Sequence, residues 1–129
     1  MSSVATAEPP RTLAQALALR SDLLAAYRAL ETTLAAEPTL DAGLRARCRA
    51  RIATLVGVAS APGLVPAPDD VVIEFVEQFV LDPHGVSDDL VARLRRVLSP
   101  RGIVALAQAV AVWEGECRLA RVLGVAPDL

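Results

Sequence analysis

Only a few side chains in this sequence could carry acid–base chemistry. The candidates outside the thiols are Glu74, Glu77, Asp82, His84, Glu114 and Glu116. Glu77 stands beside the apolar residues Val76 and Phe79. Apolar surroundings disfavour the charged form of a carboxyl, which raises its pKa and suits it to general acid–base catalysis. The alternative is an ordinary surface glutamate next to Gln78, and Glu74 is expected to face solvent.

His84 lies in a predicted turn, because it follows Asp82-Pro83 and precedes Gly85. An Asp in a turn binds backbone amides, and Gly tolerates a positive φ. His84 is therefore either a turn residue or a proton shuttle that works near pH 7.

Glu114 and Arg118 are four positions apart on a predicted helix, with the acid first. This spacing favours an ion pair, which stabilises an exposed helix by roughly 0.2–0.5 kcal/mol. The pair either lies at a solvated helix end or faces a substrate. In the second case Arg118 holds a carboxylate, Glu114 moves a proton and Trp113 walls the pocket. Glu116 and Arg121 are expected at the surface.

Composition excludes several classes of protein. The 129 residues are 53% apolar and 3% aromatic and carry a net charge of −2, which indicates one globular domain and excludes a disordered chain. No apolar run is long enough to cross a bilayer, so no membrane partner is expected. All 13 basic residues are Arg, so there is no lysine chemistry. Without a basic stripe, no nucleic-acid partner is expected either.

The thiols and the single imidazole limit metal and redox chemistry. Cys48 and Cys117 are far apart and form no CxxC motif, so the sequence predicts neither a dithiol centre nor a cysteine zinc site. They are interpreted as buried thiols in a reducing cytoplasm, with a disulfide as the alternative. With His84 as the only histidine, no metal and no other cofactor is expected within one chain.

The apolar periodicity predicts an all-α, single-domain bundle of about five helices. A flexible arm, 1–11, precedes the domain, 12–129, and a proline-rich loop spans 60–68. The predicted helices cover about 13–36, 40–58, 70–81, 87–98 and 100–123. Their predicted N-caps are Thr12, Thr39 or Asp41, Asp69 or Asp70, Ser87 and Ser99.

Two stretches leave alternatives open. The segment 103–113 is apolar all round apart from Gln108, so it is the centre of a bundle or part of a subunit interface. Four alternating arginines, 45 to 51, form either a solvated face or a contact with an anion or another subunit.

The segment 44–128 resembles the carboxymuconolactone decarboxylase and alkylhydroperoxidase D-like superfamily. The resemblance rests on the stretches GLRARCRARIATLVG, VIEFVEQFVLDPHGVSDDLVARLRRVLSP and IVALAQAVAVWEGECRLARVLGV. It places Glu77 at a family glutamate, and Trp113, Glu114 and Arg118 in the closing helix. It also implies a homo-oligomer, a trimer or a hexamer.

The chain departs from this family at its redox motif. Val58 and Ala61 stand where peroxidase members carry their two thiols, and the family's upstream acid would fall near Ala46. Because dithiol peroxide reduction needs an attacking and a resolving thiol, that activity is not expected here.

The sequence thus supports three hypotheses. The first is a cytoplasmic, cofactor-free decarboxylase or lyase acting on a small organic acid or lactone. In it Arg118 and Trp113 bind the substrate, and Glu77, His84 or Glu114 moves protons. The second is a catalytically degenerate family member that serves as an oligomeric binding or accessory protein. The third is an anion- or nucleotide-binding protein that uses the arginines at 45–51.

Overall fold

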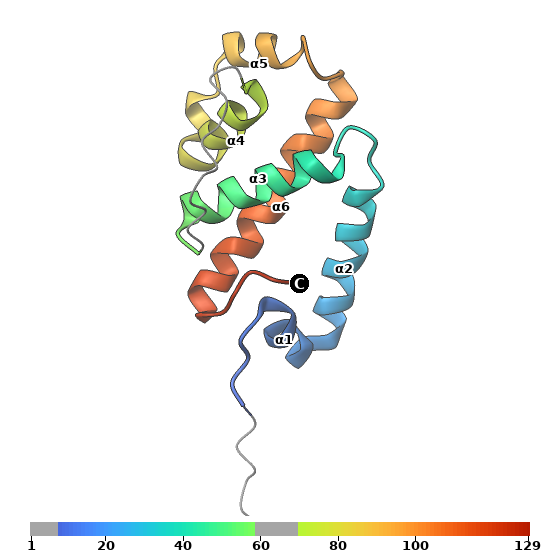
Figure 1. Cartoon of the computed structure of the whole chain (residues 1–129), viewed down its shortest axis with the longest axis vertical. Helices are drawn as coiled ribbons and strands as arrows, with labels where there is room; N and C mark the ends of the chain where they lie inside the picture. The colour runs from blue at the N-terminus through green and yellow to red at the C-terminus, as the bar shows by residue number, and fades with distance from the viewer. Residues whose placement is uncertain (1–7, 59–69) are drawn as a thin grey trace, which may run out of the picture.

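The described part of the chain, residues 8–58 and 70–129 of a computed structural model, is helical and contains no strand (Figure 1). This confirms the predicted all-α class. The α-helices are α1 (Leu13–Leu17), α2 (Ser21–Ala35), α3 (Ala42–Val56), α4 (Val71–Leu81), α5 (Asp88–Leu94) and α6 (Pro100–Leu123). Two 3-10 turns, η1 (Ala18–Arg20) and η2 (Pro83–Gly85), lie between them. Within the two described ranges, none of the helices has the length and apolarity needed to cross a bilayer.

Side-chain caps fix where the helices begin. Predicted caps accept a backbone N–H from the first turn of α1, α3, α4, α5 and α6; they are Thr12, Asp41, Asp70, Ser87 and Ser99. Gly57 ends α3 with φ 84°, and Gly124 ends α6 with φ 68°. Arg121 of α6 donates a hydrogen bond to the carbonyl of Val56, so the ends of the two helices are tied together.

Two predicted helices are shorter than expected. The continuous helix over 13–36 is wrong, because Arg20 leaves the helical region at φ −128°, ψ 81° and α2 starts afresh at Ser21. The break frees α1 to turn and bury Leu13 and Leu17. The helix over 87–98 ends at Leu94, where tighter i→i+3 hydrogen bonds take over.

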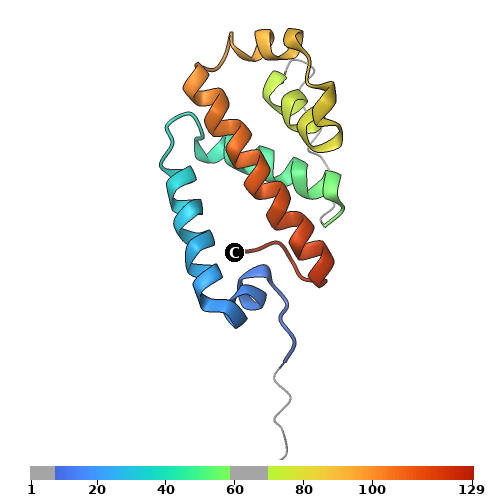
Figure 2. The ribbon, with the colours of Figure 1, turned by 180° about the vertical axis from the view of Figure 1, so that it is seen from behind.

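The core lies where α3, α4 and α6 pack on one another, with α3 crossing α6 in both ribbon views (Figures 1 and 2). Its fully buried members are mostly aliphatic: Leu40, Cys48, Ile52, Val76, Leu94, Leu106, Ala109 and Val110. The segment 103–113 supplies the centre of this core, but one side of it faces solvent within the single chain. Val104 is 70% exposed, so burial on every side is wrong for the isolated chain.

The N-terminal helices and the C-terminal tail form a looser second layer. In α2 the only buried residue is Leu34. The tail, 125–129, turns back after α6, and its end lies between α2 and α6 in both views (Figures 1 and 2). Ala126 pairs with Thr12 in an isolated parallel bridge. The predicted loop 60–68, the position of Ala61 and residues 1–7 of the arm lie outside the described residues.

Candidate functional site

The four alternating arginines of α3 are used for contacts within the chain. Each reaches a different neighbour, so they do not form a purely solvated face. Arg45 donates to the carbonyls of Ala35 and Leu40, Arg47 pairs with Asp70 at 3.6 Å, Arg49 pairs with Glu31 and Glu116, and Arg51 pairs with Glu77 at 2.8 Å. The arginines thus connect α3 to α2, α4 and α6.

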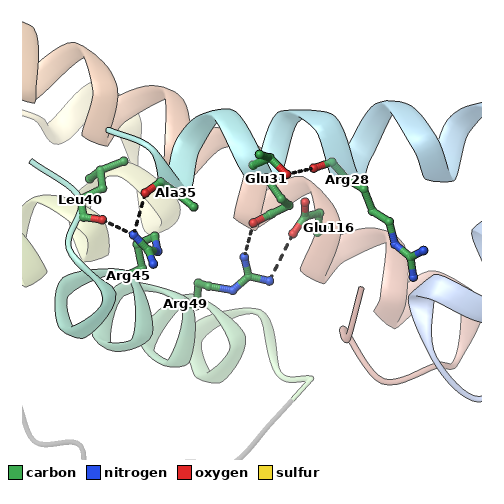
Figure 3. A network of polar contacts seen from close by, with 8 residues as sticks. Arg28, Glu31, Ala35, Leu40, Arg45, Arg49 and Glu116 are labelled. Carbon is green, nitrogen blue, oxygen red and sulfur yellow. Dashed lines mark hydrogen bonds and ion pairs between the residues drawn. The ribbon is translucent and has the colours of Figure 1, made fainter. Parts of the chain in front are cut away.

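Arg49 stands at the meeting point of three helices (Figure 3). Its Nη1 donates to Glu31 Oε2 of α2 at 2.9 Å, and its Nη2 lies 3.6 Å from Glu116 Oε2 of α6. Its guanidinium carbon lies 5.6 Å from the centroid of the Trp113 ring, within cation–π range. We call Glu31, Arg49, Trp113 and Glu116 the Arg49 cluster.

Glu116 is a buried acid, so its expected place at the surface is wrong. Only 2% of it is exposed, and its Oε1 has no hydrogen-bond partner among the described residues. Its position explains the burial, because it lies three residues after Trp113 and four before Ala120, which are also buried. Burial raises the pKa of Glu116 to about 8, and the nearby carboxyl of Glu31 adds to the rise. Arg49 opposes the shift but lies closer to Glu31.

Two pockets flank Arg49. The smaller, about 190 Å³, is lined by Arg49, Trp113, Glu116, Cys117 and the tail residues Pro127 and Asp128, together with Ala50 and Ala53. The larger, about 510 Å³, is lined by Arg28, Glu31, Thr32, Arg49, Asp128 and Leu129. The smaller pocket therefore combines a cation, an acid and apolar walls, which is the usual make-up of a small-molecule site.

The structure places Glu77 and His84 away from this pocket. The Glu77 side chain is 31% exposed and pairs with Arg51, so it is not an isolated carboxyl among apolar side chains. His84 is exposed in η2, where its backbone N–H donates to Asp82 Oδ1 at 3.2 Å. Within residues 8–58 and 70–129, no hydrogen bond or ion pair joins Glu77 or His84 to Glu114 or Arg118.

The predicted ion pair between Glu114 and Arg118 is present at 2.9 Å, with the Arg118 side chain 58% exposed. Trp113 precedes this pair in sequence but is only 1% exposed and contacts Arg49 instead. Of the five predicted site residues, the structure therefore brings only Trp113 into the Arg49 cluster.

The two cysteines are buried free thiols, and no disulfide joins them. Burial raises the pKa of Cys48 to about 12 and also raises that of Cys117. Both thiols are therefore weak nucleophiles at neutral pH. In the part of the chain that the structure describes, no three His, Cys, Asp or Glu side chains are grouped to hold a metal ion.

Sequence analysis missed Glu31 as a site residue, assigned the candidate Glu116 to the surface, and considered Arg49 only as one of the arginines at 45–51. A usable signal exists for the two acids, because each occupies a position on the apolar stripe of its helix. Glu31 lies four residues after Tyr27 and three before Leu34, and Glu116 continues the stripe through Trp113. An acid on a buried apolar stripe needs a cation or a hydrogen-bond donor beside it, and the arginines of α3 can serve as that partner.

Comparison with known proteins leaves the site to be judged on its own geometry. No protein-family model, no curated protein and no solved structure matches the chain.

Proposed function

We propose that the chain is a cofactor-free acid–base catalyst of the decarboxylase or lyase type, acting on a small organic acid or lactone at the Arg49 cluster. One observation carries this proposal. The Glu116 carboxyl is almost fully buried and lies beside both an arginine and a pocket. The resemblance to the carboxymuconolactone decarboxylase-like superfamily suggests the substrate class.

Arg49, Glu116 and Trp113 have separate roles in the proposed reaction. Arg49 binds the substrate carboxylate through its planar guanidinium. Its contact with Glu116 is long, at 3.6 Å, so the guanidinium can accept this additional partner. The bond between the carboxylate carbon and its neighbour breaks, carbon dioxide leaves, and the electron pair stays on the neighbouring carbon. Glu116, protonated at neutral pH, gives its proton to that carbon and regains one from water. Trp113 forms an apolar wall that strengthens these charge interactions.

The pocket limits the size of the substrate. Its 190 Å³ corresponds to about six water molecules at roughly 30 Å³ each, so an acid of about four to six carbons fits. Free thiols suit a reducing compartment, and we place the chain in the cytoplasm on that ground.

A second candidate is an oligomeric binding or accessory protein, as a trimer or hexamer. An apolar groove of about 300 Å³ between α2 and α6 favours it, because its lining is small or apolar: Ala26, Tyr27, Leu30, Ala111, Val112 and Gly115. A second copy would cover this groove and the exposed Val104 nearby on α6. The two candidates differ in whether a bound acid is turned over.

The test is release of carbon dioxide from two probes, 3-oxobutanoate and a carboxylated five-membered lactone. We expect Glu116→Gln to lower kcat about 100-fold or more, since it removes the proton donor. Arg49→Lys should raise KM because it loses the bidentate fork. The wild-type rate should fall as the pH rises past about 8, where Glu116 loses its proton.

The controls are Glu77→Gln, His84→Ala and Glu114→Gln. Under this proposal all three variants keep the wild-type rate. If any of them loses activity while Glu116→Gln stays active, the catalytic residues are those first predicted from the sequence, with Arg118 as the anion-binding group. Binding of the probes without turnover supports the accessory protein.

A further inference from the structure

We propose that the C-terminal tail, 125–129, is a strap that closes the Arg49 cluster and must leave before a ligand reaches Glu116. The inference rests on the proposed function for the identity of the ligand, but the strap itself is tested without one.

The tail forms a wall of both pockets. Pro127 and Asp128 line the smaller pocket, and Asp128 and Leu129 line the larger. Asp128 is the tail residue common to both, so the tail runs along the border between them. Displacing it would join the two spaces around Arg49.

The groups behind the tail are closed off. Trp113 is 1% exposed and Glu116 2%, and Cys117 is 6% exposed. In the described part of the chain, three buried atoms lack a hydrogen-bond partner: Glu31 Oε1, Trp113 Nε1 and Glu116 Oε1. A proton shared between the two carboxyls satisfies Glu31 and Glu116, whereas Trp113 Nε1 has no such neighbour. Buried polar atoms are rarely left unpaired, so a second state that exposes Trp113 Nε1 to water or a ligand accounts for it.

Of the walls of the smaller pocket, the tail is the one that can move at least cost. The other walls of this pocket are α3 and α6, which pack in the core. Beyond its first residue, three backbone hydrogen bonds attach the tail: Ala126 N–H to Arg11 O at 2.9 Å, Leu13 N–H to Ala126 O at 2.8 Å and Ala14 N–H to Asp128 O at 2.9 Å. Among the described residues no side chain of the tail forms a hydrogen bond or an ion pair.

The experiment weakens one of these attachments and measures what becomes accessible. Ala126→Pro removes the N–H that binds Arg11 O, and Ala126→Ser is the matched control that keeps it. Cys117 lies behind the tail, whereas Cys48 lies in the core and reports on unfolding of the whole chain. Labelling of the two thiols is followed separately by mass spectrometry of peptides. Trp113 is the only tryptophan, so exchange of its indole N–H is a second readout from one unambiguous NMR signal.

In Ala126→Pro we expect Cys117 labelling and indole exchange to be about tenfold faster, as the loss of about one net hydrogen bond allows, with Cys48 unchanged. If labelling becomes equally faster at Cys117 and Cys48, or no faster at either, the proposal that the tail is a strap is wrong. Added 3-oxobutanoate separates the two proposals. If it binds, its association rate, followed by Trp113 fluorescence, should rise by the same factor in Ala126→Pro. An open strap with no binding would overturn the proposed function and leave the strap standing.

Discussion

Two glutamate–arginine pairs, whose arginines lie two positions apart on α3, have the same chemistry and different surroundings. Arg51 and Glu77 are both about one-third exposed, at 27% and 31%, and within the described residues each forms an ion pair with the other alone, at 2.8 Å. Arg49 is 36% exposed, but its partner Glu116 is 2% exposed and it must also serve Glu31.

The difference shows that the role of a carboxyl depends on its burial and on how many acids share one arginine, more than on its residue type. Glu77 has an arginine of its own, whereas Glu116 is buried and shares Arg49 with Glu31, and both conditions favour the protonated form of Glu116. The Arg51–Glu77 pair connects α3 to α4, whereas Glu116 beside Arg49 holds a proton at neutral pH. Four substitutions can break or sharpen this contrast.

Of the two paired arginines, Arg49 is expected to show the larger effect when it is replaced by alanine. Arg49→Ala leaves the Glu31 carboxylate beside Glu116 with no cation and removes the contact with Trp113, so the free energy of unfolding should fall by about 2–4 kcal/mol. Arg51→Ala should cost about 1 kcal/mol or less, because water still screens Glu77. Urea denaturation of both variants at pH 7 measures the contrast, and equal losses would contradict it.

Glu116→Gln should change how stability depends on pH. The folded pKa of Glu116 is about 8 and the unfolded value about 4.3, so between them the folded chain holds the extra proton. The free energy of unfolding contributed by this group therefore falls as the pH rises through that window. At pH 9 the variant should exceed the wild type in stability, on the order of a few kcal/mol. Glu77→Gln should keep the wild-type slope, and parallel curves for Glu116→Gln and the wild type would refute the assignment.

Trp113→Phe should have a small effect for its size. The smaller ring leaves some space, but the change also removes a buried N–H that has no partner, so we expect a net loss of about 1 kcal/mol. Trp113→Ala should cost about 3–5 kcal/mol. Thermal unfolding of both variants separates them. A loss in Trp113→Phe as large as in Trp113→Ala would mean that the indole N–H has a partner.

His84→Ala should change the least. The side chain is exposed in η2 and forms no hydrogen bond or ion pair with the described residues, so stability should stay within about 0.5 kcal/mol of the wild type. A larger change in urea denaturation would show that the imidazole has a contact of its own.

Much of the fold could be predicted because its signals are local. Ser99 and Pro100 start α6 and Gly124 ends it, and each of these residues acts within a few positions of itself. The break at Arg20 was not predictable in this way. The helix before the break, α1, is hydrogen-bonded to the tail, and these segments are more than 100 positions apart in sequence.

The candidate site was harder to predict for the same reason. The ion pair of Glu114 and Arg118 lies within one helix turn and was predicted, whereas the Arg49 cluster combines α2, α3 and α6. Periodicity indicates which side of a helix is buried. It does not indicate which residues of two other helices lie opposite, and that pairing determines the surroundings of Glu116.

The sparse packing of α2 has a consequence for how the molecule opens. α2 buries one residue and α6 buries eight, so α2 should belong to a unit that unfolds locally while α3, α4 and α6 remain native. When α2 detaches, Glu31 leaves Arg49, and the cation is then free to favour the charged form of Glu116. Whether Glu116 carries its proton would thus indicate whether α2 is packed against the rest of the chain.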